Sequence, residues 1–487
     1  MTSQNRTRWF ALIVICAGAL MNVLDSTIVG VALPSIKADL NFSATSLAWV
    51  VNAYLLTFGG FLLLGGRLGD LFGQRRLFIA GIALFTFTSL LCGLALSQGM
   101  LIAARAIQGF GGAVASAVAL SLIVSLFVEP AERAKAMGVF GFVSAGGGSI
   151  GVLAGGVLTS VLDWHWIFLV NIPIGVTVCI LSLRVLPRDD RGLGGQPLDV
   201  AGAVIVTSAL MLAVYAIVNG NNAGWLSGQT LGLLVAAVLL LTTFVIVESR
   251  VQHPLVPLGM LRVPNLSAAS GVGVLWAGAM FAFFFLSALY LQLVLGYTPL
   301  KVGLAFLPAN AIMSGVSLGL SARLVGRYGV KAPVATGLGL VCVGLLLFAR
   351  APIHGGYWLD ILPSMVLLGL GGGMALNPLL LAAMGDVAPR ESGVASGVVN
   401  TAIMMGGALG LAVLTSAAAS RTTHLLASGN TRLASLLGGY HVAYLIGAAF
   451  ALIAAALTAT VLRAPGTSAF RATTPPVPKP ALAEATP

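Results

Sequence analysis

The chain has 487 residues, of which 58% are hydrophobic and only 8% are charged, and its mean hydropathy is +1.01. Soluble domains carry roughly 25% charged residues, so this composition excludes a soluble protein and predicts an integral membrane protein. The net charge of +11 is compatible with a nucleic-acid partner, but Lys and Arg fall in alternate short loops, as the positive-inside rule requires. We therefore expect a lipid bilayer and no nucleic acid as partner, with both termini cytoplasmic. The cations outside that pattern are Lys37, Lys301, Arg350, Arg421 and Arg432 on the outer side and Arg105 within a span.

Apolar runs of about twenty residues can cross the hydrocarbon core of a bilayer as helices. The chain contains fourteen such runs, which predicts an all-α fold with fourteen transmembrane helices. The first run follows a basic start, as in a signal peptide, but it continues to Pro34 without a convincing cleavage site and is expected to be retained. The expected spans are 9–33, 47–67, 77–97, 100–127, 136–160, 166–186, 199–219, 228–248, 268–294, 302–325, 332–350, 358–380, 393–418 and 440–463.

Three sequence patterns recur in the second half of the chain at a nearly constant offset, which indicates an internal duplication. The duplication predicts two six-helix halves, 1–186 and 263–463, with a linker and two inserted helices between them, 187–262. The tail 464–487 is rich in Pro, Ala and Thr and is expected to be disordered and cytoplasmic. The matching patterns are Gly66–Arg76 with Arg323–Lys331, Gln108–Gly112 with Leu368–Gly372, and Pro130–Gly151 with Pro389–Gly410.

From about Trp9 to Arg463 the chain resembles the fourteen-span drug:proton antiporters of the major facilitator superfamily. The motifs that carry the resemblance are LDSTIVGVALP (24–34), GRLGDLFGQRR (66–76), RAIQGFGGA (105–113) and WHWIFLVNIPIG (164–175). The resemblance implies a major facilitator fold and a proton-coupled antiporter, not an enzyme. It would export lipophilic drugs, antibiotics or related toxic molecules across the cytoplasmic membrane by alternating access. The chain departs from the family pattern at Val152, where Pro is usual, at His165, where Arg is expected, and at Ile403–Met405, where relatives often carry Arg-Gln.

Asp25 is the one acid that we place well inside a predicted span. An embedded carboxyl group by default marks a transport pathway, and desolvation favours its neutral form, which suits a group that binds and releases protons. Arg105 is the embedded cation, and its role in modulating a nearby carboxylate is supported by the resemblance, with Gln108 one turn along. The alternatives are a carboxyl group satisfied by Asn22, Ser26 or a neighbouring span, and an Arg105 that braces backbone carbonyls. A cationic substrate could contact Asp25 directly, and a single embedded acid favours monocationic or neutral lipophilic compounds over dications.

The turn between the second and third spans is expected to form a cytoplasmic gate. The carboxylate of Asp70 can accept hydrogen bonds from nearby Arg side chains or from the amides at a helix N-terminus, and such bonds would hold the two halves together. The second copy of the turn has Gly326 in place of Asp70, so a carboxylate latch is available only in the first half. The alternative is that its Arg residues serve only as topology signals. The gate residues are Gly66, Arg67, Asp70, Gly73, Arg75 and Arg76.

The fifth span carries Gly147, Gly151 and Gly155 on one helix face, which predicts a seam for close helix packing. A set of polar, aromatic and Met side chains within the spans suggests a cavity for an amphipathic, mainly apolar substrate. Ordinary helix packing is the alternative for each member of the set. The candidates are Asn22, Asn52, Tyr54, Trp276, Phe284, Tyr290, Asn310, Asn377, Asn400 and Met404.

No cofactor, metal or catalytic residue is expected. The four cysteines lie within apolar runs without metal or redox spacing, the five histidines lie in loops or at span ends, and the phosphate-binding loop of a primary pump is missing. The partners are then a small lipophilic substrate, protons and the bilayer, with a monomer as the functional unit. Two alternatives remain open: a dedicated exporter of one endogenous metabolite, and a proton-coupled nutrient importer. The importer is disfavoured because a sugar carrier should show more polar side chains in its spans.

Overall fold

The structure is a computed structural model that describes residues 3–43, 45–127, 129–187, 199–251, 254, 255, 258–387 and 392–462. Over these residues fourteen helices are long and apolar enough to cross a membrane. Most of the predicted linker (188–198) and the predicted tail lie outside the described residues. The elements are α1 (Ser3–Asp39), η1 (Ser46–Ala48), α2 (Trp49–Phe72), α3 (Gln74–Gly93), α4 (Gln98–Leu126), α5 (Pro130–Val161), α6 (Trp166–Leu169), α7 (Asn171–Val185), α8 (Val200–Ala223), α9 (Gly228–Arg250), η2 (Met260–Arg262), α10 (Pro264–Leu289), η3 (Tyr290–Val294), α11 (Pro299–Gly315), η4 (Val316–Leu320), α12 (Ser321–Tyr328), α13 (Lys331–Phe348), η5 (Tyr357–Ile361), α14 (Leu362–Met384), α15 (Ser392–Ala427) and α16 (Arg432–Thr460).

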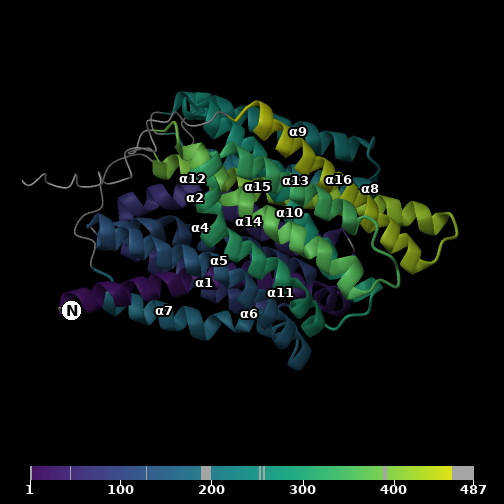
Figure 1. Cartoon of the computed structure of the whole chain (residues 1–487), viewed down its shortest axis with the longest axis horizontal. Coiled ribbons are helices and arrows are strands. Elements are labelled where there is room, and N and C mark those ends of the chain that lie inside the picture. The colour runs from purple at the N-terminus through teal and green to yellow at the C-terminus, as the bar shows by residue number, and fades with distance from the viewer. Residues whose placement is uncertain are drawn as a thin grey trace, which may run out of the picture.

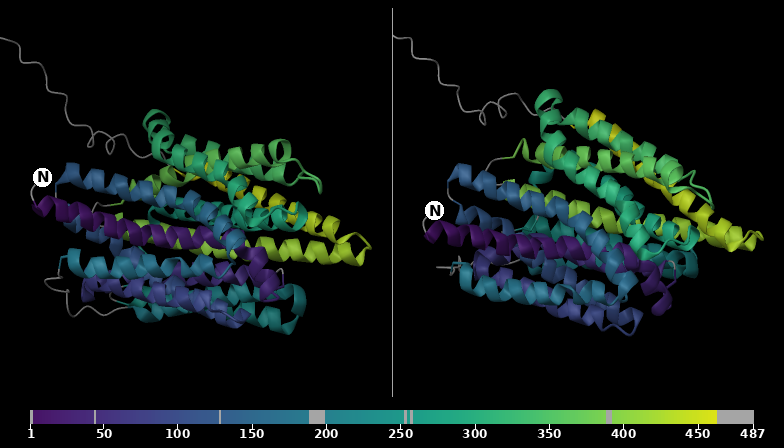
Figure 2. Two further views of the ribbon diagram at one scale, coloured as in Figure 1. Left: turned by 90° about the horizontal axis from the view of Figure 1, so that it is seen from below. Right: turned by 60° about the horizontal axis from the view of Figure 1, so that its bottom comes forward.

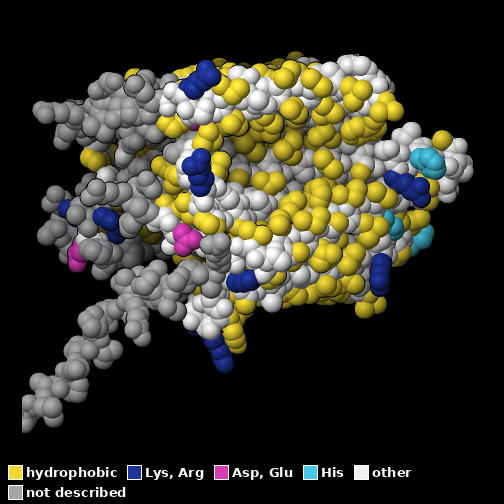
Figure 3. Space-filling model, turned by 90° about the horizontal axis from the view of Figure 1, so that it is seen from above, with side chains coloured by type: hydrophobic (Ala, Val, Ile, Leu, Met, Phe, Trp, Pro, Cys, Tyr) yellow, Lys and Arg dark blue, Asp and Glu magenta, His cyan; other side chains and the backbone are white. Residues whose placement is uncertain are grey.

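The helices run back and forth along the long axis of the molecule, so that the loops gather at its two ends (Figures 1 and 2). We call the end at which α1 begins the N-terminal face and the other end the opposite face. In the view of Figure 3, hydrophobic side chains cover the middle of the molecule, and Lys and Arg side chains lie toward its ends. This distribution is the one expected of a bundle surrounded by lipid.

The two halves repeat the same turn and the same close helix contacts. α2 ends at Gly73 and α12 ends at Gly329, both with positive φ (94° and 72°), a conformation that glycine adopts without steric cost. A Cβ atom on Gly111 of α4 would lie 3.1 Å from the carbonyl oxygen of Gly81 in α3, and Gly371 of α14 meets Gly337 of α13 in the same way at 2.4 Å. The duplication read from the sequence is therefore present in the packing.

The inserted pair α8 and α9 lies beside the junction of α2 and α15. Thr207 of α8 packs against Gly60 of α2, and Asn221 of α8 donates through Nδ2 to the carbonyl oxygen (2.7 Å) and Oγ (2.9 Å) of Ser416 in α15. α8 thus contacts both halves, whereas α9 lies at the edge of the bundle (Figure 1) with many exposed apolar side chains. An apolar exposed face is expected where a helix meets lipid tails rather than water.

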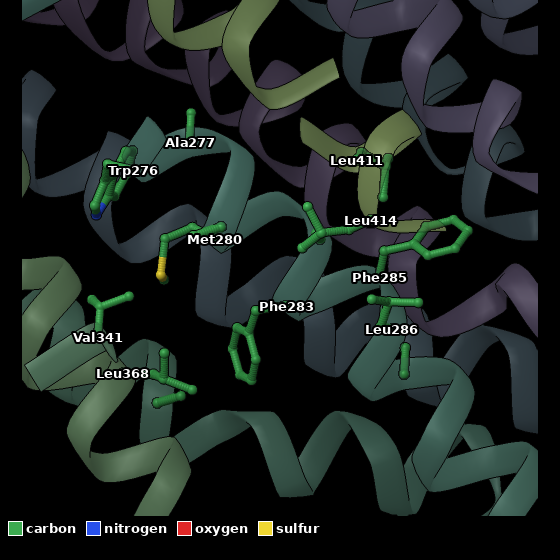
Figure 4. Close-up of a cluster of buried hydrophobic side chains, with 14 of the residues drawn as sticks. Trp276, Ala277, Met280, Phe283, Phe285, Leu286, Val341, Leu368, Leu411 and Leu414 are labelled. Atoms are coloured by element: carbon green, nitrogen blue, oxygen red, sulfur yellow. The ribbon is translucent and has the colours of Figure 1, made fainter. Parts of the chain in front are cut away.

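α10 is the central helix of the second half and is buried on nearly all sides. Figure 4 shows its side chains between Leu411 and Leu414 of α15 and the pair Val341 and Leu368 of α13 and α14. The labelled α10 residues are Trp276, Ala277, Met280, Phe283, Phe285 and Leu286. This packing against α13, α14 and α15 holds α10 in place.

The expected limits of the last two spans are wrong. α15 continues to Ala427 instead of ending at 418, and α16 begins at Arg432 instead of 440. The hairpin projects beyond the other helices on the opposite face (Figure 1). Polar residues such as Arg421 interrupt the apolar run without breaking the helix, because outside the hydrocarbon core a helix needs no continuous apolar sequence.

Candidate functional site

Asp25 is completely buried between α1 and the rest of the first half. Its Oδ2 atom forms an ion pair with the guanidinium of Arg105 in α4. Its Oδ1 atom accepts from Nε2 of Gln108 at 2.9 Å and from Nδ2 of Asn171 at 3.3 Å. All three partners are donors, and an ionised carboxylate can only accept. The arrangement therefore matches the ionised form of Asp25.

Arg105 is fixed by several groups in addition to Asp25. Its Nε donates to the carbonyl oxygen of Val50 at 3.0 Å, and its Nη1 donates to Oε1 of Gln108 at 2.7 Å. The guanidinium carbon lies 4.4 Å from the centroid of the Tyr54 ring, a geometry that stabilises a cation. Arg105 is thus both the partner of the carboxylate and a brace to backbone, the two alternatives that the sequence left open.

Two members of this cluster were missing from the predicted site. Ser89 of α3 accepts through Oγ from Gln108 (3.2 Å) and Asn171 (3.1 Å), and it donates to the carbonyl oxygen of Phe168 (2.9 Å). Asn171 lies in the motif WHWIFLVNIPIG, so the resemblance to the family is the one signal in the sequence that could have pointed to it. Ser89 has no signal in the sequence that distinguishes it from other serines in the transmembrane helices. We call Asp25, Ser89, Arg105, Gln108 and Asn171 the carboxylate cluster.

A cavity of about 500 Å³ lies between the two halves. It is bounded by α1 and α5 on one side and by α10, α11, η4 and α14 on the other. Of the described residues that line it, none is charged, and most are apolar or aromatic. They are Val23, Ser26, Thr27, Gly30, Val31, Phe140, Gly141, Gly148, Val152, Trp276, Met280, Phe281, Phe284, Phe306, Asn310, Met313, Ser314, Ser317, Leu318, Gly372, Leu376 and Asn377.

Asp25 does not line this cavity. Its neighbours Ser26 and Thr27 do, because successive helical side chains point in different directions and α1 turns Asp25 toward α4 and α7. Direct contact between a substrate and this carboxylate, which the sequence left possible, is therefore absent from the arrangement seen here. One side of α1 instead carries Asp25, which faces α4 and α7, and another side carries Ser26 and Thr27, which line the cavity.

Several polar side chains of the cavity wall donate their protons to backbone carbonyl oxygens, which leaves their oxygen atoms as acceptors. Thr27 donates its hydroxyl proton to the carbonyl oxygen of Val23 (2.9 Å), as does Ser26. Asn377 donates to the carbonyl oxygen of Ser317 at 3.0 Å, which fixes its amide with Oδ1 away from that partner. An acceptor-rich wall without charge suits ligands that bring donors of their own.

Only some of the predicted cavity residues line it. Trp276, Phe284, Asn310 and Asn377 do. The others make contacts elsewhere. Asn22 donates to Ser116, Asn400 donates to Ser396, and Tyr290 donates to the carbonyl oxygen of Pro352. Tyr54 stacks on Arg105, Met404 packs on Gly59 of α2, and Asn52 is fully buried. For these residues helix packing, the alternative interpretation, describes the structure.

Four of the six predicted gate residues can be placed. A Cβ atom on Gly66 would meet nothing within 4 Å, and Gly73 forms the positive-φ turn into α3. Arg75 donates to the carbonyl oxygen of Leu183 at the end of α7, and Arg76 follows it in the first turn of α3. The side chains of Arg67 and Asp70 lie outside the described residues, so the latch remains a prediction.

α5 makes a close contact with α11 in addition to the predicted glycine seam. The structure places Gly147, Gly151 and Gly155 against α1, where a Cβ atom on Gly151 would lie 2.0 Å from Oγ1 of Thr27. The contact with α11, which sequence reasoning missed, lies at Gly156, where a Cβ atom would be 2.8 Å from the carbonyl oxygen of Pro299. α5 therefore joins the two halves closely.

Two hydrogen bonds join the halves at the opposite-face end. There Leu300 donates its N–H to Oγ of Ser160 (2.9 Å), and Gln292 donates to the carbonyl oxygen of Val31 in α1 (2.8 Å). Toward the N-terminal face, a Cβ atom on Gly141 of α5 would meet nothing within 4 Å. Polar contacts thus join the halves at the opposite face, whereas the space beside Gly141 in the cavity wall is open.

Comparisons with known proteins agree with this architecture. The family model described as Major Facilitator Superfamily matches residues 15–411. The chain is 41% identical over 457 residues to the puromycin resistance protein pur8 of Streptomyces alboniger, covering 93% of this chain and 90% of that one. It is 37% identical over 460 residues to the cephamycin export protein CmcT of Amycolatopsis lactamdurans, covering 94% and 93%. A solved structure of a bacterial homolog of the human lysosomal transporter Spinster, in an inward-facing and occupied conformation, matches with a TM-score of 0.69 at 14% identity, covering 93% and 96%.

A duplicated bundle of fourteen candidate membrane helices around a central cavity defines a multi-pass membrane transporter rather than an enzyme. The chain belongs to the Major Facilitator Superfamily.

Proposed function

We propose that this transporter exports lipophilic antibiotics or related toxic small molecules across the cytoplasmic membrane in exchange for protons. The observation that carries the proposal is the pairing, on α1, of a completely buried carboxylate cluster with the wall of a mainly apolar cavity. Export is supported by two relatives that are named for puromycin resistance and cephamycin export. The protein would act as a monomer, since one chain supplies both the cavity and the carboxylate.

The orientation of the protein in the membrane follows from the charge pattern. Because Lys and Arg concentrate at the N-terminal face, we assign that face to the cytoplasm, with both termini there. The hydrogen bonds between the halves lie on the opposite face, so the structure would correspond to the state that receives substrate from the cytoplasm and the inner membrane leaflet. The halves, 1–186 and 263–463, would then rock about the cavity, with the segment 187–262 carrying the inserted helices.

Coupling would be indirect, through α1. Protonation of Asp25 from the outer side removes its charge and weakens its pairing with Arg105, which frees α1 to shift against α4. Such a shift moves Ser26 and Thr27 in the cavity wall. Substrate and proton then compete through the position of one helix, because each favours a different one. Asp70, with the Arg residues of its turn, would hold the cytoplasmic side closed in the outward-facing state.

The cavity indicates the substrate class. Aromatic faces and Met side chains suit a flat apolar body, and the acceptors of Ser26, Thr27 and Asn377 suit a ligand with amine or hydroxyl donors. No described lining residue offers a cation, so a carboxylate would lose its hydration without compensation. We therefore expect neutral or monocationic aromatic compounds to be preferred to anionic ones.

Transport in inverted membrane vesicles tests this function. Puromycin, which carries an amine, should accumulate in the vesicles when a proton gradient is imposed, and a protonophore should abolish the accumulation. A carboxylated analogue of the same aromatic body should accumulate at least tenfold more slowly. Accumulation that persists after the gradient has collapsed would overturn proton coupling, and equal rates for the amine and the carboxylate would overturn the substrate class. A panel of unrelated antibiotics separates a multidrug exporter from one dedicated to a single metabolite.

A further inference from the structure

In the carboxylate cluster, the amide nitrogen of Asn171 forms hydrogen bonds, whereas its amide oxygen does not. Nδ2 donates to Asp25 and Ser89, whereas Oδ1 is buried and has no hydrogen-bond partner among the described residues. The side chain is 1% exposed. A buried acceptor without a partner is energetically unfavourable, so its retention beside a functional carboxylate calls for an explanation.

The explanation lies in what a protonated Asp25 requires. The carboxylic acid adds an O–H donor, which needs an acceptor once buried. Arg105 has only donors. Oε1 of Gln108 already accepts from Arg105 and from the thiol of Cys92, and the Ser89 hydroxyl already accepts twice. Among the described side chains that are hydrogen-bonded to Asp25, the acceptor without a partner is Oδ1 of Asn171.

We propose that Asn171 is a positioning residue that serves both protonation states of Asp25. In the ionised state its Nδ2 donates to the carboxylate, as seen here. In the protonated state, a rotation of its amide by about half a turn presents Oδ1 to the new O–H group, a torsion that is broad for Asn. Only the O–H bond forms, with a proton from the outer aqueous side. This inference rests on the proposed proton coupling through Asp25.

The direction of the effect follows from what each state loses without Asn171. The carboxylate keeps Arg105 and the 2.9 Å bond from Gln108 and loses only the 3.3 Å bond. The acid loses its acceptor altogether. Removing Asn171 should therefore disfavour protonation, by a factor of roughly ten or more in the protonation equilibrium. The titratable and charged groups facing Asp25 are Arg105 on α4, Tyr54 on α2 and Cys92 on α3, and all three remain in the variants.

The test compares N171A and N171L with S182A in proteoliposomes. Ser182 lies on the same helix, is equally buried and is remote from Asp25 in the hydrogen-bond network. Gradient-driven puromycin accumulation is measured as a function of pH on the outer side, and puromycin counterflow is measured without a gradient. We expect both Asn171 variants to shift the pH midpoint of accumulation by about one unit toward acid, with counterflow retained, and S182A to match the wild type.

Two outcomes overturn different claims. An unchanged pH midpoint in both Asn171 variants, with a wild type that responds to the gradient, refutes the role of Asn171 alone. A wild type whose accumulation ignores the gradient refutes the proton coupling on which it rests. If the larger side chain of N171L abolishes counterflow, N171A decides the question, and a shift toward alkaline pH in N171A counts against the inference.

Discussion

Replacing Arg105 by Met tests the electrostatics of the carboxylate cluster. The substitution keeps an unbranched side chain of similar length but removes the guanidinium that pairs with Asp25, donates to Val50 and Gln108 and lies over Tyr54. Breaking a buried ion pair by removing one partner costs about 3–5 kcal/mol, because a buried charge is left uncompensated. Removing both charges together avoids most of that cost.

We therefore expect R105M to be destabilised by about 3–5 kcal/mol. The double variant D25N/R105M should be more stable than R105M alone, with a coupling energy of roughly 2 kcal/mol. The assay is the free energy of unfolding in detergent micelles titrated with SDS, followed by tryptophan fluorescence. Strictly additive effects of the two substitutions would refute the buried ion pair as the main interaction.

Three further predictions concern the packing between the halves. G151V places a branched side chain against α1, where even a Cβ atom would be 2.0 Å from another side chain; we expect transport to fall more than tenfold, whereas G138A, which adds its Cβ in open space on the same helix and away from the cavity lining, should keep wild-type transport rates. The double variant S160C/L300C should form a disulfide that holds the opposite face closed and stops export, and reduction should restore it; export by the fully cross-linked protein would contradict this gate. Q292L removes one contact of the same gate, the hydrogen bond from Gln292 to Val31. It should raise the maximal transport rate or the substrate leak through the opposite face and leave the affinity for substrate on the cytoplasmic side unchanged, both of which are measured from the uptake rate as a function of substrate concentration.

Much of the fold could be predicted from the sequence because a membrane imposes strong rules. Apolar runs of a fixed length predict the transmembrane helices. Lys and Arg concentrate in alternate loops between these helices, which predicts the orientation of each helix. These rules stop at the membrane surface, which is why the ends of α15 and α16 were misplaced. There the helices continue through polar residues such as Arg421, and only tertiary structure reveals them.

The site could be predicted less evenly. Asp25 and Arg105 stand out because charged groups are rare in spans, and the structure brings them into contact. For uncharged polar residues the sequence gives the helix but not the direction of the side chain. Asn310 lines the cavity while Asn22 binds Ser116 within one half, and both look alike in sequence. The direction depends on how each helix is rotated against its neighbours.

The central claim is that protonation of Asp25 drives export. The most direct measurement uses proteoliposomes that contain a pH-sensitive dye and are exposed to a puromycin gradient. For the wild type we predict proton movement opposite to the substrate flow, and for D25N we predict downhill substrate flow without proton movement. Substrate flow by the wild type without protons, or proton movement by D25N equal to that of the wild type, would contradict the account.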